Sequence, residues 1–344
     1  MKSNASFRSL VLGLGFAVAA VLPVDASAAT ELTVYTAMEN EVLASYKKAF
    51  ETANPDIRIK WVRDSTGVIT ARLLAEKDNP QADVIWGVYA SSVSLLGKEG
   101  MLEAYAPAGL DRIDAKFRHP GNPPLWTGNG VEATAVCVNK IELAKQNLPM
   151  PSTWRDLVKP VYKNKIVMPN PASSGTGYSA VNAWRQIFGV QEAWKFMDAL
   201  HDNIAQYTHS GSKTCTMAAM GEYPIGISLD FRSIVLSRQG APLEIVLPLE
   251  GLGLDVNAVA LIKKSKNIEA ARKLADFAIS EEAFRLYQPY FAALARPEMN
   301  MPTKEMPGAY YDRLLSIDFD KAGDARPEVL KEWRQRFDSK SEAK

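Results

Sequence analysis

The chain has 344 residues, of which 47% are hydrophobic and 23% charged, as in an ordinary globular protein with a buried core. At roughly 150 residues per domain, this length suggests two domains. Lys and Arg number 40 against 39 Asp and Glu, and this balance disfavours a nucleic-acid partner, which needs a basic surface. Two Cys and three His disfavour a disulfide-rich scaffold and a zinc site built from several such ligands.

The first 28 residues have the pattern of an export signal. Lys2 and Arg8 begin it, an uncharged apolar run covers 10–22, and the small residues Ala-Ser-Ala occupy 26–28. The apolar run is shorter than the ~20 residues that a membrane-spanning helix needs. We therefore expect cleavage after Ala28 and an exported mature protein, with no lipid anchor because no Cys follows the apolar run.

Export would place Cys137 and Cys215 in an oxidising compartment, where they could form a disulfide. Each could equally be a small buried hydrophobic side chain. The sequence does not give the distance between them, so both interpretations stay open.

Strands and helices alternate at the start of the mature chain. Short β-branched and aromatic runs predict strands, and apolar residues at helical spacing predict helices between them. In order, the expected elements are 32–36, 39–53, 57–62, 68–77, 82–86 and 91–98. This β-α-β-α-β-α order predicts a mostly parallel sheet covered by helices.

A second α/β unit follows a Pro-, Gly- and Asn-rich stretch at 120–130, which suggests a domain boundary. The strand expected at 131–139 leaves the first lobe, and the strand expected at 255–262 returns to it. The other strands expected after the boundary are 165–168, 204–208, 225–229 and 243–247. The helices expected there are 177–188, 191–201, 213–220, 268–279, 281–288, 308–315 and 325–336.

The predicted fold is therefore an α/β clamshell of two lobes joined by crossing strands. We expect the N-terminal lobe to contain 29–132 and 255–303, and the C-terminal lobe to contain 133–254 and 304–344. Ligands of open α/β sheets bind beyond the carboxyl ends of the strands, and in a clamshell these ends face the cleft between the lobes.

Catalytic motifs are missing from the sequence. It contains no P-loop, no G-x-S-x-G and no H-E-x-x-H, and its three His are scattered. These features disfavour an enzyme, and they indicate neither a metal nor a cofactor.

The strongest binding signal is the loop from Ser174 to Gly177, which precedes a predicted helix. Backbone N–H groups at a helix N-terminus favour an anion, the glycines let it approach the backbone, and Ser174 and Thr176 add hydroxyl donors. The alternative is an ordinary N-cap that serves only its own helix. Similar small polar junctions follow other strands, at Thr36, Ala37, Ser65, Thr66, Ser210 and Ser212. Converging neutral donors of this kind suit a small oxyanion.

Two acids lie near these junctions, Glu39 and Asp230. Either they are solvated or salt-bridged, since Arg232 is close to Asp230 in sequence, or the ligand also carries a positive charge. A zwitterion would place its anion on the loop and its ammonium group on an acid. The aromatic residues Tyr89, Tyr207 and Trp86 either wall the cleft or belong to the core.

Four segments together resemble the periplasmic solute-binding proteins of ABC importers: LTVYTAMENEVLASYKKAFE, ADVIWGVYA, SSGTGYSAVNAW and GEYPIGISLDF. The resemblance covers nearly the whole mature chain. It is closest to the ferric-ion-binding-like group and, within that group, to the subgroup assigned to 2-aminoethylphosphonate uptake. It implies a two-lobed type II (Venus-flytrap) fold, a monomer, no enzymatic activity, and permease and ATPase partners.

The same resemblance argues against iron. Ferric binders of the group use a His after the first strand, a Glu after the ADV strand and a Tyr pair after the GIS strand. This chain has Glu39, Val88 and Asp230-Phe231 at those places, which removes most of the hard oxygen ligands that Fe(III) prefers. The anion loop of the group matches Ser174 to Thr176, and this is the part that would hold a phosphonate.

The resulting hypothesis is a binding protein for 2-aminoethylphosphonate or a close analogue. Its expected ligand-binding residues are Thr36, Ala37, Glu39, Ser65, Thr66, Tyr89, Ser174, Gly175, Thr176, Gly177, Tyr207, Ser210, Ser212 and Asp230. Three further functions stay open: a binder of phosphate, polyamine or ferric ion, an exported enzyme acting on phosphoesters, and a sensor partner of a membrane receptor.

Overall fold

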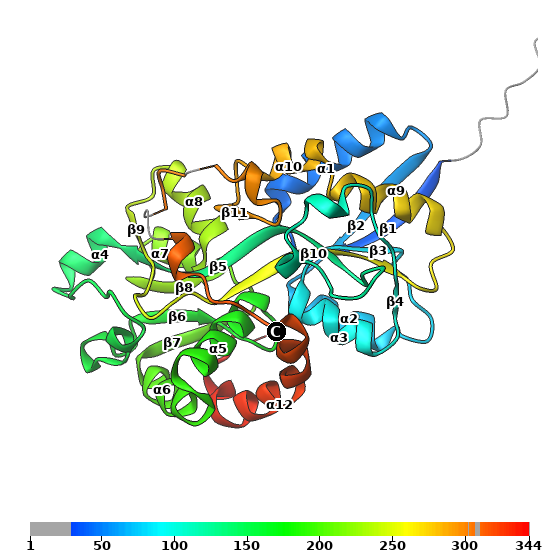
Figure 1. The fold of residues 1–344 in the computed structure, drawn as a ribbon. Helices are drawn as coiled ribbons and strands as arrows, with labels where there is room; N and C mark the ends of the chain where they lie inside the picture. Colours follow the sequence, from blue (N-terminus) through cyan, green and yellow to red (C-terminus); the bar gives the residue numbers. More distant parts are fainter. Residues whose placement is uncertain (1–28, 302, 307–309, 344) are drawn as a thin grey trace, which may run out of the picture.

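The computed structural model describes residues 29–301, 303–306 and 310–343, which form two α/β lobes side by side (Figure 1). The predicted export signal lies outside the described residues. Among the described residues, no helix has both the length and the apolar character required to cross a membrane.

Three parallel strands and their helices build the N-terminal lobe, on the right in Figure 1. The strands are β1 (Thr30–Thr36), β2 (Ile57–Arg63) and β3 (Val84–Tyr89). The helices are α1 (Asn40–Ala53), α2 (Thr66–Ala75), α3 (Ala90–Lys98), α9 (Ile268–Ala278) and α10 (Glu281–Tyr287). Each of these elements lies within a few residues of its predicted position.

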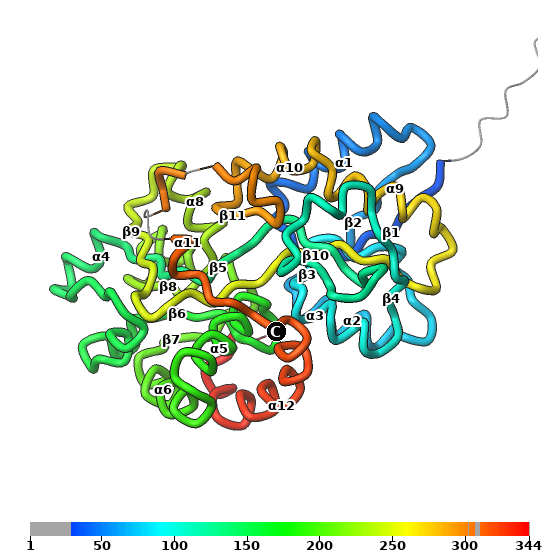
Figure 2. Tube along the Cα trace, viewed as in Figure 1, coloured from blue at the N-terminus to red at the C-terminus, as the bar shows by residue number. Residues whose placement is uncertain are grey.

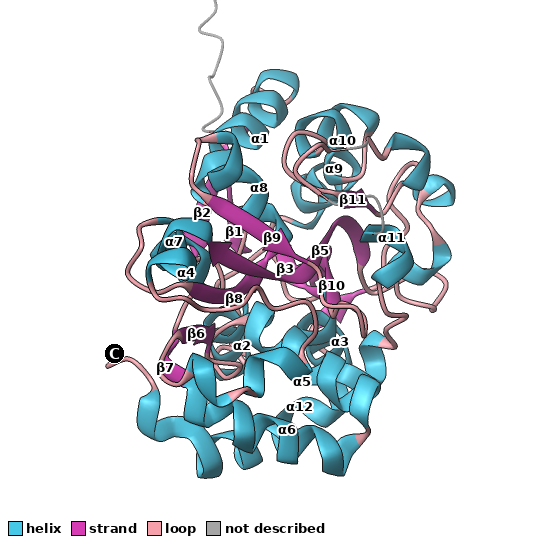
Figure 3. Cartoon of the chain, turned by 90° about the vertical axis from the view of Figure 1, so that its left-hand side faces the viewer, coloured by secondary structure: helices cyan, strands magenta, loops and turns pink. Residues whose placement is uncertain are grey.

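The C-terminal lobe has the same kind of construction. Its strands are β6 (Ile166–Pro169), β7 (Ile204–Thr208), β8 (Ile225–Leu229) and β9 (Leu243–Val246). Its helices are α4 (Lys140–Lys145), α5 (Gly175–Phe188), α6 (Val190–Asn203), α7 (Lys213–Ala219) and α8 (Asp230–Arg238). Helices cover both faces of the strands (Figure 3).

Two buried strands, β5 (Thr127–Asn139) and β10 (Leu254–Ile262), join the lobes. The strand order is β2-β1-β3-β10-β5-β8-β6-β7, so the sheet is mixed, with antiparallel pairing on both sides of β10 and β5. The first half of β5 pairs with β10, and the second half pairs with β8 and β9. The short strand β11 (Ala293–Leu294) pairs with β5, and α11 (Tyr310–Arg313) comes after it in the chain (Figure 2).

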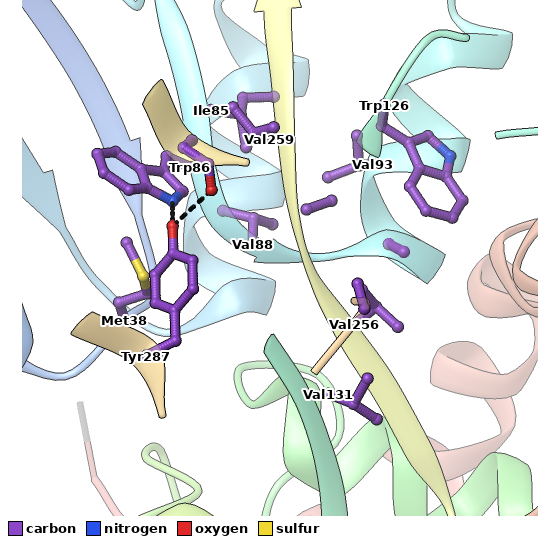
Figure 4. Close-up of a cluster of buried hydrophobic side chains, with 14 of the residues drawn as sticks. Met38, Ile85, Trp86, Val88, Val93, Trp126, Val131, Val256, Val259 and Tyr287 are labelled. Carbon is purple, nitrogen blue, oxygen red and sulfur yellow. Dashed lines mark hydrogen bonds between the residues drawn. The ribbon is translucent and has the colours of Figure 1, made fainter. Parts of the chain in front are cut away.

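Two large hydrophobic clusters form the core: one fills the N-terminal lobe and extends to β8, α8 and β9, and the other lies in the C-terminal lobe. In the N-terminal core Trp86 donates a hydrogen bond of 3.1 Å to the Tyr287 hydroxyl, and both side chains are fully buried (Figure 4). The C-terminal core contains Trp154, Trp184 and Trp333. Trp86 is thus a core residue, one of the two interpretations that the sequence left open.

Three helices differ from the sequence-based predictions, and the first of them, α4, was not expected at all. Helix α8 follows β8 without a loop, and the sequence analysis missed it. Helix α12 spans Phe319–Phe337, whereas 325–336 was expected, because Asp318 caps its first turn and the helix continues through Pro327. It contacts both lobes: the Ala322 carbonyl accepts a hydrogen bond from Tyr178 of α5, and Asp324 pairs with Lys98 of α3.

A disulfide joins Cys137 of β5 to Cys215 of α7, with 5.4 Å between the Cα atoms. Both residues are fully buried. The structure therefore favours the first of the two interpretations that the sequence left open.

We expect the double substitution Cys137→Ala, Cys215→Ala to lower the free energy of unfolding by about 2–5 kcal/mol, because the bridge spans 78 residues and restricts the unfolded chain. Chemical denaturation with and without a reductant measures this difference. The reductant should lower the stability of the wild type and leave the variant unchanged. Equal stability of the two proteins without reductant would contradict the prediction.

Candidate functional site

A polar cleft of about 390 Å³, open solvent included, lies between the lobes. The N-terminal lobe and β5 line it with Ala37, Glu39, Arg63, Ser65, Thr66, Tyr89 and Glu132. The C-terminal lobe lines it with Ser174, Gly175, Thr176, Ser210, Gly211, Ser212 and Leu229. Ten of these residues are among those expected from the sequence to bind the ligand.

The Ser174–Thr176 segment forms the C-terminal wall at the start of α5. The Ser174 side chain caps the helix by accepting a hydrogen bond of 3.3 Å from the Gly177 N–H. Within the part of the chain that the structure describes, the N–H groups of Gly175 and Thr176 have no backbone acceptor. The helix therefore offers two free amide donors and the Thr176 hydroxyl to the cleft, next to the positive end of its dipole.

A second loop, residues 210–212, packs directly against this segment. A Cβ atom on Gly211 would lie 2.2 Å from the Thr176 Oγ1 atom, so only glycine permits the contact. The hydroxyl groups of Ser210 and Ser212 are 2.9 Å apart. We call the four hydroxyl-bearing residues Ser174, Thr176, Ser210 and Ser212, with the two free amides, the anion cradle.

The N-terminal lobe touches the C-terminal lobe next to the cradle. The Gly67 N–H, in the first turn of α2, donates a hydrogen bond of 2.9 Å to the Ser173 carbonyl. A Cβ atom on Gly67 would lie 2.3 Å from the Ala172 carbonyl oxygen, and one on Gly175 would lie 2.6 Å from the Tyr89 ring. These close contacts define a closed arrangement of the lobes.

Glu39 lies at the edge of the cleft in an ion-pair network. Its carboxylate is 2.8 Å from the Arg63 guanidinium and 3.1 Å from that of Arg232, which also contacts Glu41 at 2.8 Å. Arg232 belongs to α8, so the network links α8 to the start of α1. Of the two interpretations open for Glu39, the structure favours the salt-bridged one.

Asp230 is not part of the cleft lining. Its side chain is 1% exposed and accepts hydrogen bonds from the Tyr310 hydroxyl and the Phe231 N–H. Burial raises the pKa of Asp230 to about 6. The residue begins the missed helix α8, and this placement turns its carboxyl toward Tyr310. The geometry thus gives no support to the expected contact between Asp230 and a ligand ammonium group.

Three further residues expected at the site lie behind the cleft surface. The Thr36 hydroxyl accepts a hydrogen bond from the Met38 N–H and is fully buried. Gly177 packs so closely on Pro169 that a Cβ atom would lie 2.4 Å from its carbonyl oxygen. Tyr207 is in the core of the C-terminal lobe, and its hydroxyl oxygen lies 2.9 Å from the Nδ1 atom of His201.

The sequence analysis missed four lining residues: Arg63, Glu132, Gly211 and Leu229. Glu132 is the most informative, since it is 8% exposed and accepts a hydrogen bond from Tyr89. Burial raises the pKa of Glu132 to about 8, and the nearby carboxylate of Asp230 adds to this effect. A signal was available, because Glu132 is the one charged residue in the otherwise uncharged segment 127–139.

No group of three or more His, Cys, Asp or Glu residues is arranged to hold a metal ion in the described parts of the chain. Phe231, at the place of a ferric tyrosine ligand, stacks on Tyr290 at 5.6 Å between ring centroids. Tyr310 is engaged with Asp230. The described residues therefore provide no obvious ligand set for ferric ion.

Comparisons with known proteins agree with this architecture. A family model described as bacterial extracellular solute-binding protein matches residues 79–322. An uncharacterized protein of Haemophilus influenzae is 31% identical over 342 residues, 97% of each chain. The spermidine/putrescine-binding periplasmic protein of Salmonella typhimurium is 26% identical over 62% of this chain and 63% of its own. A putative 2-aminoethylphosphonate-binding periplasmic protein of Salmonella typhi is 22% identical over 66% of each.

Solved structures confirm the predicted two-lobed fold. The periplasmic binding protein AfuA from Actinobacillus pleuropneumoniae, with exogenous fructose-6-phosphate bound, is 31% identical with a TM-score of 0.84, over 90% of this chain and 99% of that one. Iron-bound HitA from Pseudomonas aeruginosa is 19% identical with a TM-score of 0.75, over 88% and 99%, and shows the fold alone. The chain belongs to the bacterial extracellular solute-binding protein family.

Proposed function

We propose that this protein captures a small organic phosphate or phosphonate in the periplasm and passes it, unchanged, to the permease and ATPase of an ABC importer. The observation that carries the proposal is the anion cradle, in which free amides and four hydroxyl-bearing residues converge on one side of the cleft. Hydrogen bonds to an anion are stronger than those between neutral groups, so several neutral donors can hold a desolvated oxyanion.

The charges around the cleft support a ligand held by neutral donors. Arg63 is the one basic residue among the described lining residues, and Glu39 is paired with it. A phospho group on the cradle would therefore be held mainly by dipoles. Such a site discriminates by geometry, because each amide and hydroxyl has a fixed direction.

A sugar phosphate is the first candidate ligand. The structure with fructose-6-phosphate bound belongs to a protein 31% identical to this chain. 2-Aminoethylphosphonate, the ligand expected from the sequence, is the second candidate, supported by a 22% identical protein and by the acidic residues Glu39 and Glu132 in the lining. The cradle suits both, since each ligand ends in a tetrahedral oxyanion.

A polyamine ligand and phosphoester turnover have less support. A polyamine would leave the anion cradle without a role and would need more unpaired carboxylates than the lining offers. Membership of a solute-binding family supports capture without turnover rather than phosphoester chemistry.

We also propose that the export signal is cleaved after Ala28 and that the mature protein is a monomer. Its two lobes would have the boundaries given in the sequence analysis.

Closure of the lobes explains how binding can be signalled to a permease. A ligand in the cleft would touch the cradle on one lobe and Ser65, Thr66 and Tyr89 on the other, because both sets of residues line the cleft in the closed form. A ligand that binds one form better shifts the population toward it. The permease would then recognise the closed shape.

The double substitution Ser174→Ala, Thr176→Ala should weaken binding of the phospho group by roughly 100-fold or more, since a hydrogen bond to a charged group contributes about 1.5–3 kcal/mol. Calorimetry with fructose-6-phosphate, 2-aminoethylphosphonate and inorganic phosphate measures the loss. The matched control is Ser45→Ala, Thr52→Ala, which removes two hydroxyls bonded only to the backbone of α1. Equal affinity of the two variants for every probe would contradict the proposal.

Gly67→Ala should hinder closure, because its Cβ atom would collide with the Ala172 and Ser173 carbonyls of the opposite lobe. We expect a larger radius of gyration in small-angle scattering and weaker ligand binding, with an unchanged melting temperature of the ligand-free protein. The exposed neighbour Val68→Ala is the control. A Gly67→Ala protein as compact as the control would show that this contact does not govern closure.

A further inference from the structure

Glu132 lies in the hinge strand β5, at the floor of the cleft and close to the cradle. Its carboxyl accepts a hydrogen bond from the Tyr89 hydroxyl, and the Thr176 side chain of the cradle approaches the same phenol. Thr176, Tyr89 and Glu132 therefore form a short polar chain that leads from the cradle to the hinge. A ligand anchored on the cradle would extend along this chain.

The groups that surround Glu132 give it no positive partner. Those facing it are Tyr89 of β3, Asp230 at the start of α8, Glu39 after β1, Asn257 and Asp255 of β10, Tyr46 of α1 and Tyr310 of α11. No ion pair among the described residues includes Glu132, and the nearby guanidinium groups of Arg63 and Arg232 are paired with Glu39. The Asn257 amide nitrogen lies near but makes no hydrogen bond of normal geometry.

We infer that Glu132 is the specificity-determining residue of the cleft. In its uncharged form, its carboxyl group recognises the ligand through hydrogen bonds to a hydroxyl or carbonyl oxygen of that ligand. The inference rests on the proposed function, since it assumes a phospho group on the cradle. It assigns the ligand to the hydroxylated phosphates, of which sugar phosphates are the example, rather than to phosphonates with an ammonium group.

The reason is electrostatic. Burial raises the pKa of Glu132 to about 8 in the closed arrangement of the lobes, and the adjacent Asp230 carboxylate opposes a second negative charge. A phosphate dianion on the cradle opposes it further, so a neutral ligand tail leaves Glu132 protonated. An ammonium group would do the opposite and favour the carboxylate.

The two ligand classes therefore move protons in opposite directions. Binding of a sugar phosphate raises the pKa of Glu132 above 8, so the protein takes up a proton near pH 8 and its affinity falls as the pH rises further, by at most tenfold per unit. Binding of an ammonium phosphonate lowers that pKa, so a proton is released. The phosphate itself does not contribute, because its second pKa is near 6.

Calorimetry of the full-length mature protein at pH 8, in two buffers of different ionisation enthalpy, gives the number of protons exchanged. With fructose-6-phosphate we expect fractional proton uptake in the wild type and none in Glu132→Gln, whose affinity, unlike that of the wild type, does not fall as the pH rises above 8. Glu244→Gln, an exposed residue of β9, is the control and should behave like the wild type. The pH profile of the wild type tests the inference even if Glu132→Gln does not fold.

The outcomes separate the two proposals. Tight binding of 2-aminoethylphosphonate with proton release, abolished by Glu132→Gln, would overturn the neutral-acid assignment and leave the proposed function intact. Binding of fructose-6-phosphate without proton uptake would overturn the assignment as well. Failure to bind fructose-6-phosphate, 2-aminoethylphosphonate and inorganic phosphate would overturn the proposed function itself.

Discussion

The pairing of β5 is the constraint on which the rest of the structure depends. One half of this strand belongs to the sheet of the N-terminal lobe and the other half to that of the C-terminal lobe, so the two lobes share a backbone. The register fixes where the lobes face each other. It also places Glu132 at the cleft floor and Cys137 against α7, only five residues apart on the same strand.

Much of the fold was predictable because its signals are local. Apolar spacing and β-branched runs located nearly every strand and helix, and the order of elements indicated the clamshell. Helix α8 was missed because its only start signal is Asp230, directly after a strand, where a loop is the usual expectation. The start of α12 was predicted at 325 instead of Phe319, which places Pro327 in the first turn, where proline is tolerated; in the structure Pro327 lies inside a helix held by contacts with α3 and α5.

The site was predictable to the extent that it consists of helix N-termini. Small polar residues between strands and helices identified the cradle residues, because the residues that cap a helix are adjacent in sequence to its first turn. The direction of a side chain is not local information: Asp230 turns toward Tyr310, more than seventy residues further along the chain, while Glu132 enters the cleft from a strand that looks like pure core. The sequence analysis therefore chose Asp230, which the structure places outside the cleft lining, and overlooked Glu132, although a single Glu in an uncharged strand was a usable signal.

The contact between the Gly67 N–H and the Ser173 carbonyl joins the lobes through main-chain atoms. This bond does not depend on the identity of the side chains, except that position 67 must be glycine. Residues that contact the ligand can therefore be exchanged without changing the main-chain contact that closes the two lobes. A scaffold of this kind can acquire a new cargo through a few substitutions while the shape offered to its transporter stays the same.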